Sequence, residues 1–159
     1  EIKERIENGL LDMGLVTEPV DISKYNFFRL PQKEQWGILV HEKHRLAQKT
    51  FITPDDLINE PLIIAKRIAV QNELINWFNN SPEKLNIVAT YNLILNAANM
   101  VKHQIGVALC FNLNFDNLYQ DLRFIPLFPE IKTGAVLIWK KNHIYSQTMS
   151  HFIKSIKNA

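Results

Sequence analysis

The sequence predicts an α/β protein, because short apolar runs of strand length alternate with segments whose apolar residues recur at helical spacing. Hydrophobic residues make up 47% of the 159 positions, which is enough to form a sizeable core. No apolar run is as long as a membrane crossing requires. The 18 basic and 16 acidic residues give a formal charge of +2. This small imbalance does not indicate nucleic-acid binding and leaves small molecules and proteins as partners.

The predicted strands are mostly apolar runs bounded by polar residues, glycine or proline. They lie at residues 11–16, 25–30, 36–40, 61–65, 85–89, 105–110, 122–125 and 135–139. A turn at 31–35 is expected to separate the second run from the third, and Glu18-Pro19 is expected to prevent the first run from continuing as a helix.

The predicted helices carry apolar residues three and four positions apart. They lie near residues 2–9, from Thr53 onward, at 70–78, at 93–101 and after Ser146. The second has the clearest start, because Thr53 supplies a capping oxygen, Pro54 occupies the first helical position and acids follow in the first turn. This order of strands and helices favours parallel βαβ units with helices on both faces of the sheet.

Motifs for catalysis are lacking in the sequence. The five glycines form no phosphate loop or dinucleotide fingerprint, and no Gly-x-Ser-x-Gly turn occurs. His41 and His44 have a spacing seen in metal sites, but no second cluster of ligands accompanies them. The single cysteine, Cys110, ends an apolar run, which indicates core packing or the lining of a pocket rather than a nucleophile. We therefore expect no enzyme, metal or cofactor, and, with no secretion signal visible, a cytoplasmic protein.

Four segments of the chain resemble the ligand-binding domain of LysR-type transcriptional regulators. They are residues 10–16, 37–47, 51–64 and 91–109. The third is the most specific, since it matches the family's short capped helix leading into a strand. Arg45 replaces the proline of a His-Pro-Leu-Ala-like corner, and Gln104 and Phe111 stand where Gly and Pro are common in the family. These departures affect loops more than architecture, and the resemblance spans almost the whole chain.

The resemblance implies a two-lobed, periplasmic-binding-protein-like fold of type 2 with mixed sheets. The first lobe is expected to comprise residues 1–39 together with 141–159, and the second lobe residues 40–140. The family's winged helix-turn-helix, its linker helix and the first strand, helix and second strand of its ligand domain have no counterpart in the sequence that begins at Glu1. We therefore expect an incomplete first lobe and DNA binding only through a missing N-terminal domain.

Ligands of open α/β sheets collect at the carboxyl ends of strands, where loops and helix starts converge. The residues expected there, lining a cleft between the lobes, are Thr17, Lys66, Arg67, Thr90, Tyr91, Asn92 and Cys110. Lys66 and Arg67 are cationic donors, which favours an anionic effector, although solvation of both side chains explains them too. Asn92 is expected to cap a helix and to present an amide, and Tyr91 is expected to offer a stacking face.

The predicted function is an effector-sensing domain that binds a small molecule and forms a homodimer, or a tetramer in the full-length regulator. Trp77 and Phe78 fit either a subunit interface or ordinary core packing. Two other functions stay open. A solute-binding protein of a transporter would require an export signal, and an enzyme using the same cleft would require a nucleophile beside a base.

Overall fold

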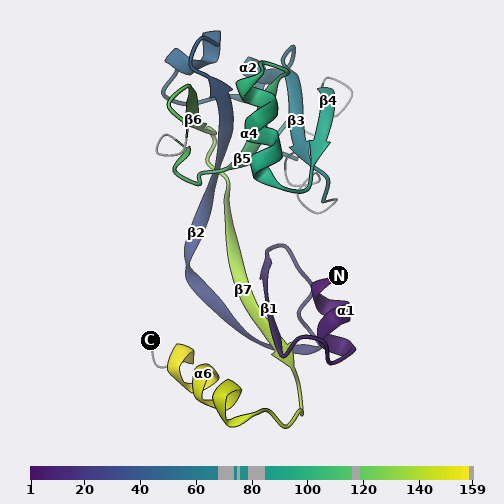
Figure 1. The fold of residues 1–159 in the computed structure, drawn as a ribbon. Helices are drawn as coiled ribbons and strands as arrows, with labels where there is room; N and C mark the ends of the chain where they lie inside the picture. Colours follow the sequence, from purple (N-terminus) through teal and green to yellow (C-terminus); the bar gives the residue numbers. More distant parts are fainter. Residues whose placement is uncertain (68–73, 75, 79–84, 116–118, 158–159) are drawn as a thin grey trace. The chain divides into compact units, whose positions relative to one another are not determined.

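The computed structural model describes residues 1–67, 74, 76–78, 85–115 and 119–157. The chain divides into two compact units, Glu1–Lys33 with Thr133–Ala159, and Glu34–Lys132 (Figure 1). The strand β2 (Tyr25–His41) contains one boundary between these units, after Lys33, and the strand β7 (Lys132–Lys140) begins at the other, after Lys132. Each unit has a hydrophobic core of its own, and the two are described separately below.

The first unit contains α1 (Ile2–Glu7), β1 (Met13–Thr17), the beginning of β2, most of β7 and α6 (Gln147–Lys157). Strand β1 pairs with β7 in antiparallel register from Met13↔Trp139 to Thr17↔Ala135. Helix α1 packs closely on β1 at Gly14, because a Cβ atom at this position would overlap the side chain of Ile2.

The core of the first unit is small. Its buried members are Ile6, Tyr25, Val136 and Ile138, with Val16 and Ile22 packed against them. The predicted cap of the last helix is confirmed, since the Ser146 hydroxyl accepts a hydrogen bond from the Met149 amide at 3.2 Å.

The second unit contains a mixed sheet. Its elements are the end of β2, the 3-10 helix η1 (Arg45–Gln48), α2 (Pro54–Leu57), β3 (Pro61–Ala65), β4 (Asn86–Tyr91), α4 (Ile94–Lys102), β5 (Val107–Phe111) and β6 (Leu122–Pro126). Strand β2 pairs antiparallel with β5 and with β6, whereas β3 runs parallel to both β4 and β5. The expected parallel βαβ arrangement thus holds for β3, β4 and β5.

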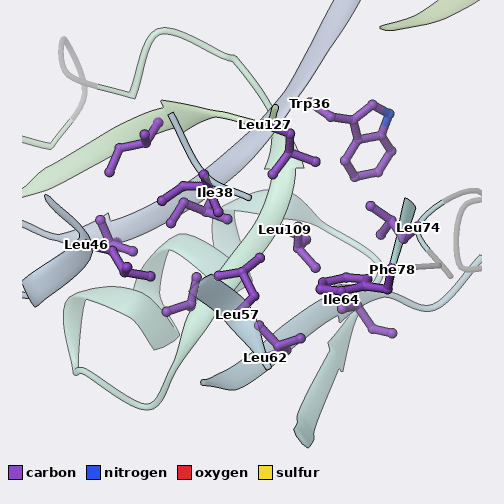
Figure 2. Packing of buried hydrophobic residues seen from close by; sticks show 14 residues of the cluster. Trp36, Ile38, Leu46, Leu57, Leu62, Ile64, Leu74, Phe78, Leu109 and Leu127 are labelled. Atoms are coloured by element: carbon purple, nitrogen blue, oxygen red, sulfur yellow. The ribbon is translucent and has the colours of Figure 1, made fainter. Parts of the chain in front are cut away.

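Alternate residues of these strands point to opposite faces of the sheet, and each face carries its own apolar cluster. Leu62 and Ile64 belong to the cluster drawn in Figure 2, which also includes Leu57 of α2 together with Leu74 and Phe78. Ile63, between them in sequence, belongs to the other cluster, which includes Ala97, Ala98 and Val101 of α4. Side chains from helices therefore cover both faces, as predicted.

The start of α2 is confirmed in detail, because Thr53 and Asp56 form a capping box and Pro54 occupies the first turn. The turn predicted at 31–35 is wrong, since β2 continues without interruption from Tyr25 to His41. Side chains 31–34 are exposed, so the polarity of this stretch reflects contact with water rather than a change of chain direction. Of the helix predicted at 70–78, Val70 lies outside the described residues.

Candidate ligand-binding site

The three parallel strands of the second unit end at one edge of its sheet. Ala65, the last residue of β3, is in register with Tyr91, the last residue of β4. Ile63 is in register with Ala108 of β5, so this strand ends at the same level. The amide of Lys66 donates to the Tyr91 carbonyl at 2.9 Å, which extends the pairing by one residue. This edge is where an α/β sheet offers backbone groups and side chains to a ligand.

The polar residues predicted for the site lie at this edge and are accessible to solvent. Lys66 and Arg67 follow β3, and Thr90 and Asn92 lie at and just beyond the end of β4. All four residues are exposed. The sheet topology therefore brings these four residues to one edge, although they come from segments far apart in the sequence.

Tyr91 is held in place by its own hydroxyl group. The hydroxyl donates to the Leu109 carbonyl at 2.8 Å, which links the end of β4 to β5. Burial raises the pKa of Tyr91, and the nearby Cys110 raises it further, so the hydroxyl keeps its proton and remains a donor at neutral pH. The ring packs partly against the cluster beneath α4. Its predicted use as a stacking face stays a prediction.

Cys110 is fully buried in the same cluster, whose other members include Ala108, two residues before it on β5, and also Phe115 and Leu122. Burial raises the pKa of its thiol, so the thiolate needed for nucleophilic or redox chemistry is disfavoured. This placement favours core packing over the lining of a pocket. Direct contact of Cys110 with a ligand stays a prediction.

The prediction that Asn92 caps the following helix is wrong. The cap residue of α4 is Leu93, whose side chain has no oxygen atom and makes no capping hydrogen bond. The reason is that the chain remains extended for one residue more, with Leu93 at φ −113° and ψ 124°. Helix α4 thus begins without a side-chain cap, and among its first amide groups that of Asn96 donates to the Leu93 carbonyl at 3.0 Å.

Thr17, the remaining predicted site residue, belongs to the first unit and ends β1. The next residue, Glu18, was not among the predicted site residues. Its carboxylate pairs with Arg29 of β2 (Oε1–Nε 3.0 Å), and its amide donates to the Gly134 carbonyl at 2.9 Å. These two contacts hold Glu18 in place beside the end of β1.

Metal binding and membrane crossing find no support in the part of the chain that the structure describes. It contains no group of three or more His, Cys, Asp or Glu side chains able to hold a metal ion. His41 and His44 accept backbone hydrogen bonds at Nδ1 from Lys43 and Leu46 instead. Among the described residues, no helix has the length and apolar character needed to span a bilayer.

Comparison with known proteins agrees with this architecture. The sequence profile of the family described as LysR substrate binding domain matches residues 1–159. The chain belongs to this family, which confirms the resemblance found in the sequence and the predicted type of fold.

Individual relatives are distant. YvbU of Bacillus subtilis strain 168, an uncharacterized HTH-type transcriptional regulator, is 22% identical over 118 residues, which are 74% of this chain and 39% of YvbU. HinK, a LysR family transcriptional regulator from Pseudomonas aeruginosa, has a similar structure with a TM-score of 0.81 at 19% identity, over 99% of this chain and 56% of HinK. This chain thus spans well under two thirds of either regulator.

Isolated effector binding domains are also similar in fold. The domain of QuiR in complex with shikimate gives a TM-score of 0.83 at 17% identity, over 98% of this chain and 74% of that domain. The BenM domain with its effector benzoate gives 0.75 at 20% identity, over 98% and 72% respectively. At such low identity the likeness shows a shared fold.

Proposed function

We propose that this chain is the effector-sensing domain of a cytoplasmic LysR-type transcriptional regulator, and that it binds a small anionic molecule without catalysing a reaction. The observation that carries the proposal is the family match over all 159 residues. We further propose that the two units correspond to the two predicted lobes, although the units divide after Lys33 and Lys132 rather than after residues 39 and 140.

The charge proposed for the effector rests on the edge formed by β3, β4 and β5. Lys66 and Arg67 place two cationic side chains there, and a guanidinium group matches the two oxygens of a carboxylate. The uncapped start of α4 adds backbone donors and the positive end of a helix dipole. Shikimate, which is bound in the QuiR structure, and benzoate, the effector in the BenM structure, are both carboxylates, which supports the same class of ligand here.

Residues Thr90, Tyr91 and Asn92 are proposed to orient the ligand, together with Thr17 of the first unit. A ligand that favours one conformation of the domain over another shifts their populations, and this shift is the proposed signal to the rest of the regulator. Contact with DNA is assigned to a part of the regulator outside this chain.

Isothermal titration calorimetry tests the proposed ligand class. Benzoate and shikimate would be compared with their methyl esters, which have nearly the same shape and no charge. We expect the carboxylates to bind more tightly, and the variants Lys66→Gln and Arg67→Gln to reduce this preference. Lys33→Gln removes an exposed lysine of the other unit and serves as the control. Esters that bind as tightly as the acids would contradict the proposal.

We also propose a homodimer, and a tetramer for the full-length regulator. Trp77 stays a candidate for the interface, because its ring is only partly buried even though its Nε1 donates to the Pro129 carbonyl at 2.8 Å. Leu74 and Phe78, by contrast, are buried in the core of the second unit. Sedimentation velocity should show a mass that rises with protein concentration, whereas a constant monomer mass would exclude the dimer.

A further inference from the structure

A surface pocket of about 210 Å³ lies within the first unit. It is formed by the end of α1, the connection into β1, and the end of β7 with the loop that follows. Its polar lining includes Glu7, Asp12, Lys140, His143 and Tyr145. The pocket lies at the Met13 end of β1, and Thr17 marks the other end of this strand. It is therefore separate from the proposed effector site.

Lys140, the lysine in the wall of the pocket, is already engaged. Its ammonium group lies 3.2 Å from the carbonyl oxygen of Glu7 and 3.7 Å from the Glu7 carboxylate. The end of α1 thus already attracts one cation, as expected for the carbonyl end of a helix. Because Lys140 is held by Glu7, its charge is largely balanced by that residue.

The Asp12 carboxylate, unlike the Lys140 ammonium group, is not engaged in this way. No hydrogen bond or ion pair with another residue in the described part of the chain reaches it. Its charge is nevertheless felt inside the pocket, because Asp12 adds to the effect of burial in raising the pKa of Tyr145. Among the described residues, the Asp12 carboxylate therefore has no counter-ion, and it lies close enough to Tyr145 to act on the pKa of that side chain.

The aromatic wall is held in a fixed orientation. The Tyr145 hydroxyl donates to the Lys140 carbonyl at 2.6 Å, and the His143 ring packs edge-on against Tyr145 with centroids 4.9 Å apart. The apolar side chain of Leu11 also lines the pocket. Its neighbour Leu10 is 71% exposed, and Ile144, between the two rings in sequence, is 95% exposed. A carboxylate, an aromatic face and exposed apolar side chains together suit an organic cation.

We propose that this pocket binds the ammonium group of a small alkylamine, with Asp12 as the counter-ion, Tyr145 beside the cation and Leu11 against the alkyl chain. The volume agrees with such a ligand. It exceeds the roughly 150 Å³ of a cavity that holds benzene, and it lies below the roughly 300 Å³ at which pockets for drug-sized ligands begin. So small a ligand is expected to bind in the millimolar range.

The test is a titration of the ¹⁵N-labelled chain followed by amide chemical shifts in two-dimensional NMR. The probe is n-butylammonium chloride, with n-butanol and sodium butyrate as neutral and anionic probes of the same length. We expect saturable shifts of the Leu11, Asp12 and His143 amides with n-butylammonium alone. Asp12→Asn should weaken binding by about 1.4- to fivefold, the range for an exposed charge pair. Glu34→Gln, the loss of one exposed carboxylate in the other unit, should leave binding unchanged.

Several results would overturn the proposal. One is the absence of saturable shifts at these amides, and another is an equal response to butanol, which would indicate an apolar site without charge selection. Chemical-shift changes centred on the Lys66 and Asn92 amides would show that the amine binds to the second unit instead. If Asp12→Asn bound n-butylammonium with unaltered affinity, Asp12 would not be its counter-ion. The comparison of the three probes uses the unsubstituted chain, so it stands even if that variant does not fold.

Discussion

Replacing Glu60 tests how the corner between β2 and β3 is held. Glu60 is 7% exposed and pairs with two residues at the start of η1, His44 and Arg45. The His44 Nε2 lies 3.2 Å from one carboxylate oxygen, and the Arg45 guanidinium bonds to the other. Arg45 also donates to the Asp56 carbonyl at 3.2 Å. Glu60→Gln keeps the volume of the side chain and removes its charge.

The expected loss is worked from the exposure of each partner. The Arg45 side chain is 61% exposed and can be rehydrated, so its pair contributes at most about 1 kcal/mol. The His44 side chain is only 29% exposed, and a hydrogen bond to a charged group contributes about 1.5 kcal/mol. The glutamine is easier to desolvate than a carboxylate, which offsets part of both losses. We therefore expect Glu60→Gln to lower the free energy of unfolding by about 1–2 kcal/mol.

The assay is urea unfolding of the second unit, followed by tryptophan fluorescence. Two of the three tryptophans, Trp36 and Trp77, lie in this unit, so a Trp139→Phe background restricts the signal to it. A double-mutant cycle with Arg45→Ala isolates the Arg45–Glu60 pair, and a coupling energy of about 0.5–1 kcal/mol is expected. A change below about 0.3 kcal/mol for Glu60→Gln, or strict additivity with Arg45→Ala, would refute this account of the corner.

Three further predictions concern the second unit and use the same fluorescence assay. Leu62→Ala empties a fully buried site and should cost about 2–5 kcal/mol, so a loss below about 1 kcal/mol would show that the core relaxes around it. Thr53→Ala breaks the capping box and should cost about 1 kcal/mol, a loss that Thr53→Ser should largely avoid. Tyr91 binds its proton more tightly in the folded than in the unfolded chain, so stability is full below its ordinary pKa of 10.0 and falls as the pH rises above it, by up to about 1.4 kcal/mol per pH unit. Tyr91→Phe should remove this part of the slope between about pH 10 and 11, and an unchanged slope would place the titration elsewhere.

Local signals in the sequence predicted most of the elements, because a short strand or a capped helix start is specified by neighbouring residues. Thr53 and Pro54 define the start of α2 in this way. The continuous strand β2 was missed because residues 31–35 have the polarity of a turn, whereas the pairing of β2 with its neighbours in the sheet joins segments far apart in the sequence. The start of α4 was placed one residue early because Leu93 is extended although its side chain cannot cap.

The candidate sites differ in how far they could be predicted. The edge of Lys66, Thr90 and Asn92 follows from topology alone, because parallel strands of known order must end together. The pocket of the first unit does not, since Glu7 and Lys140 meet across 133 positions of sequence. The pairing of Glu60 with His44 and Arg45 was missed for the same reason, as nothing local links a residue to a partner fifteen positions away.

The hydrogen bond from the Tyr91 hydroxyl to the Leu109 carbonyl separates the groups that hold the edge of the sheet together from the side chains available to a ligand. A second hydrogen bond, from the Lys66 amide to the Tyr91 carbonyl, also joins the strand ends. Neither of the two bonds uses the side chain of Lys66 or Asn92. Those exposed side chains can be exchanged without loosening the strands beneath them. Recognition of a new compound is therefore open to evolution, or to a designer, through substitutions that leave the stability of the scaffold nearly untouched.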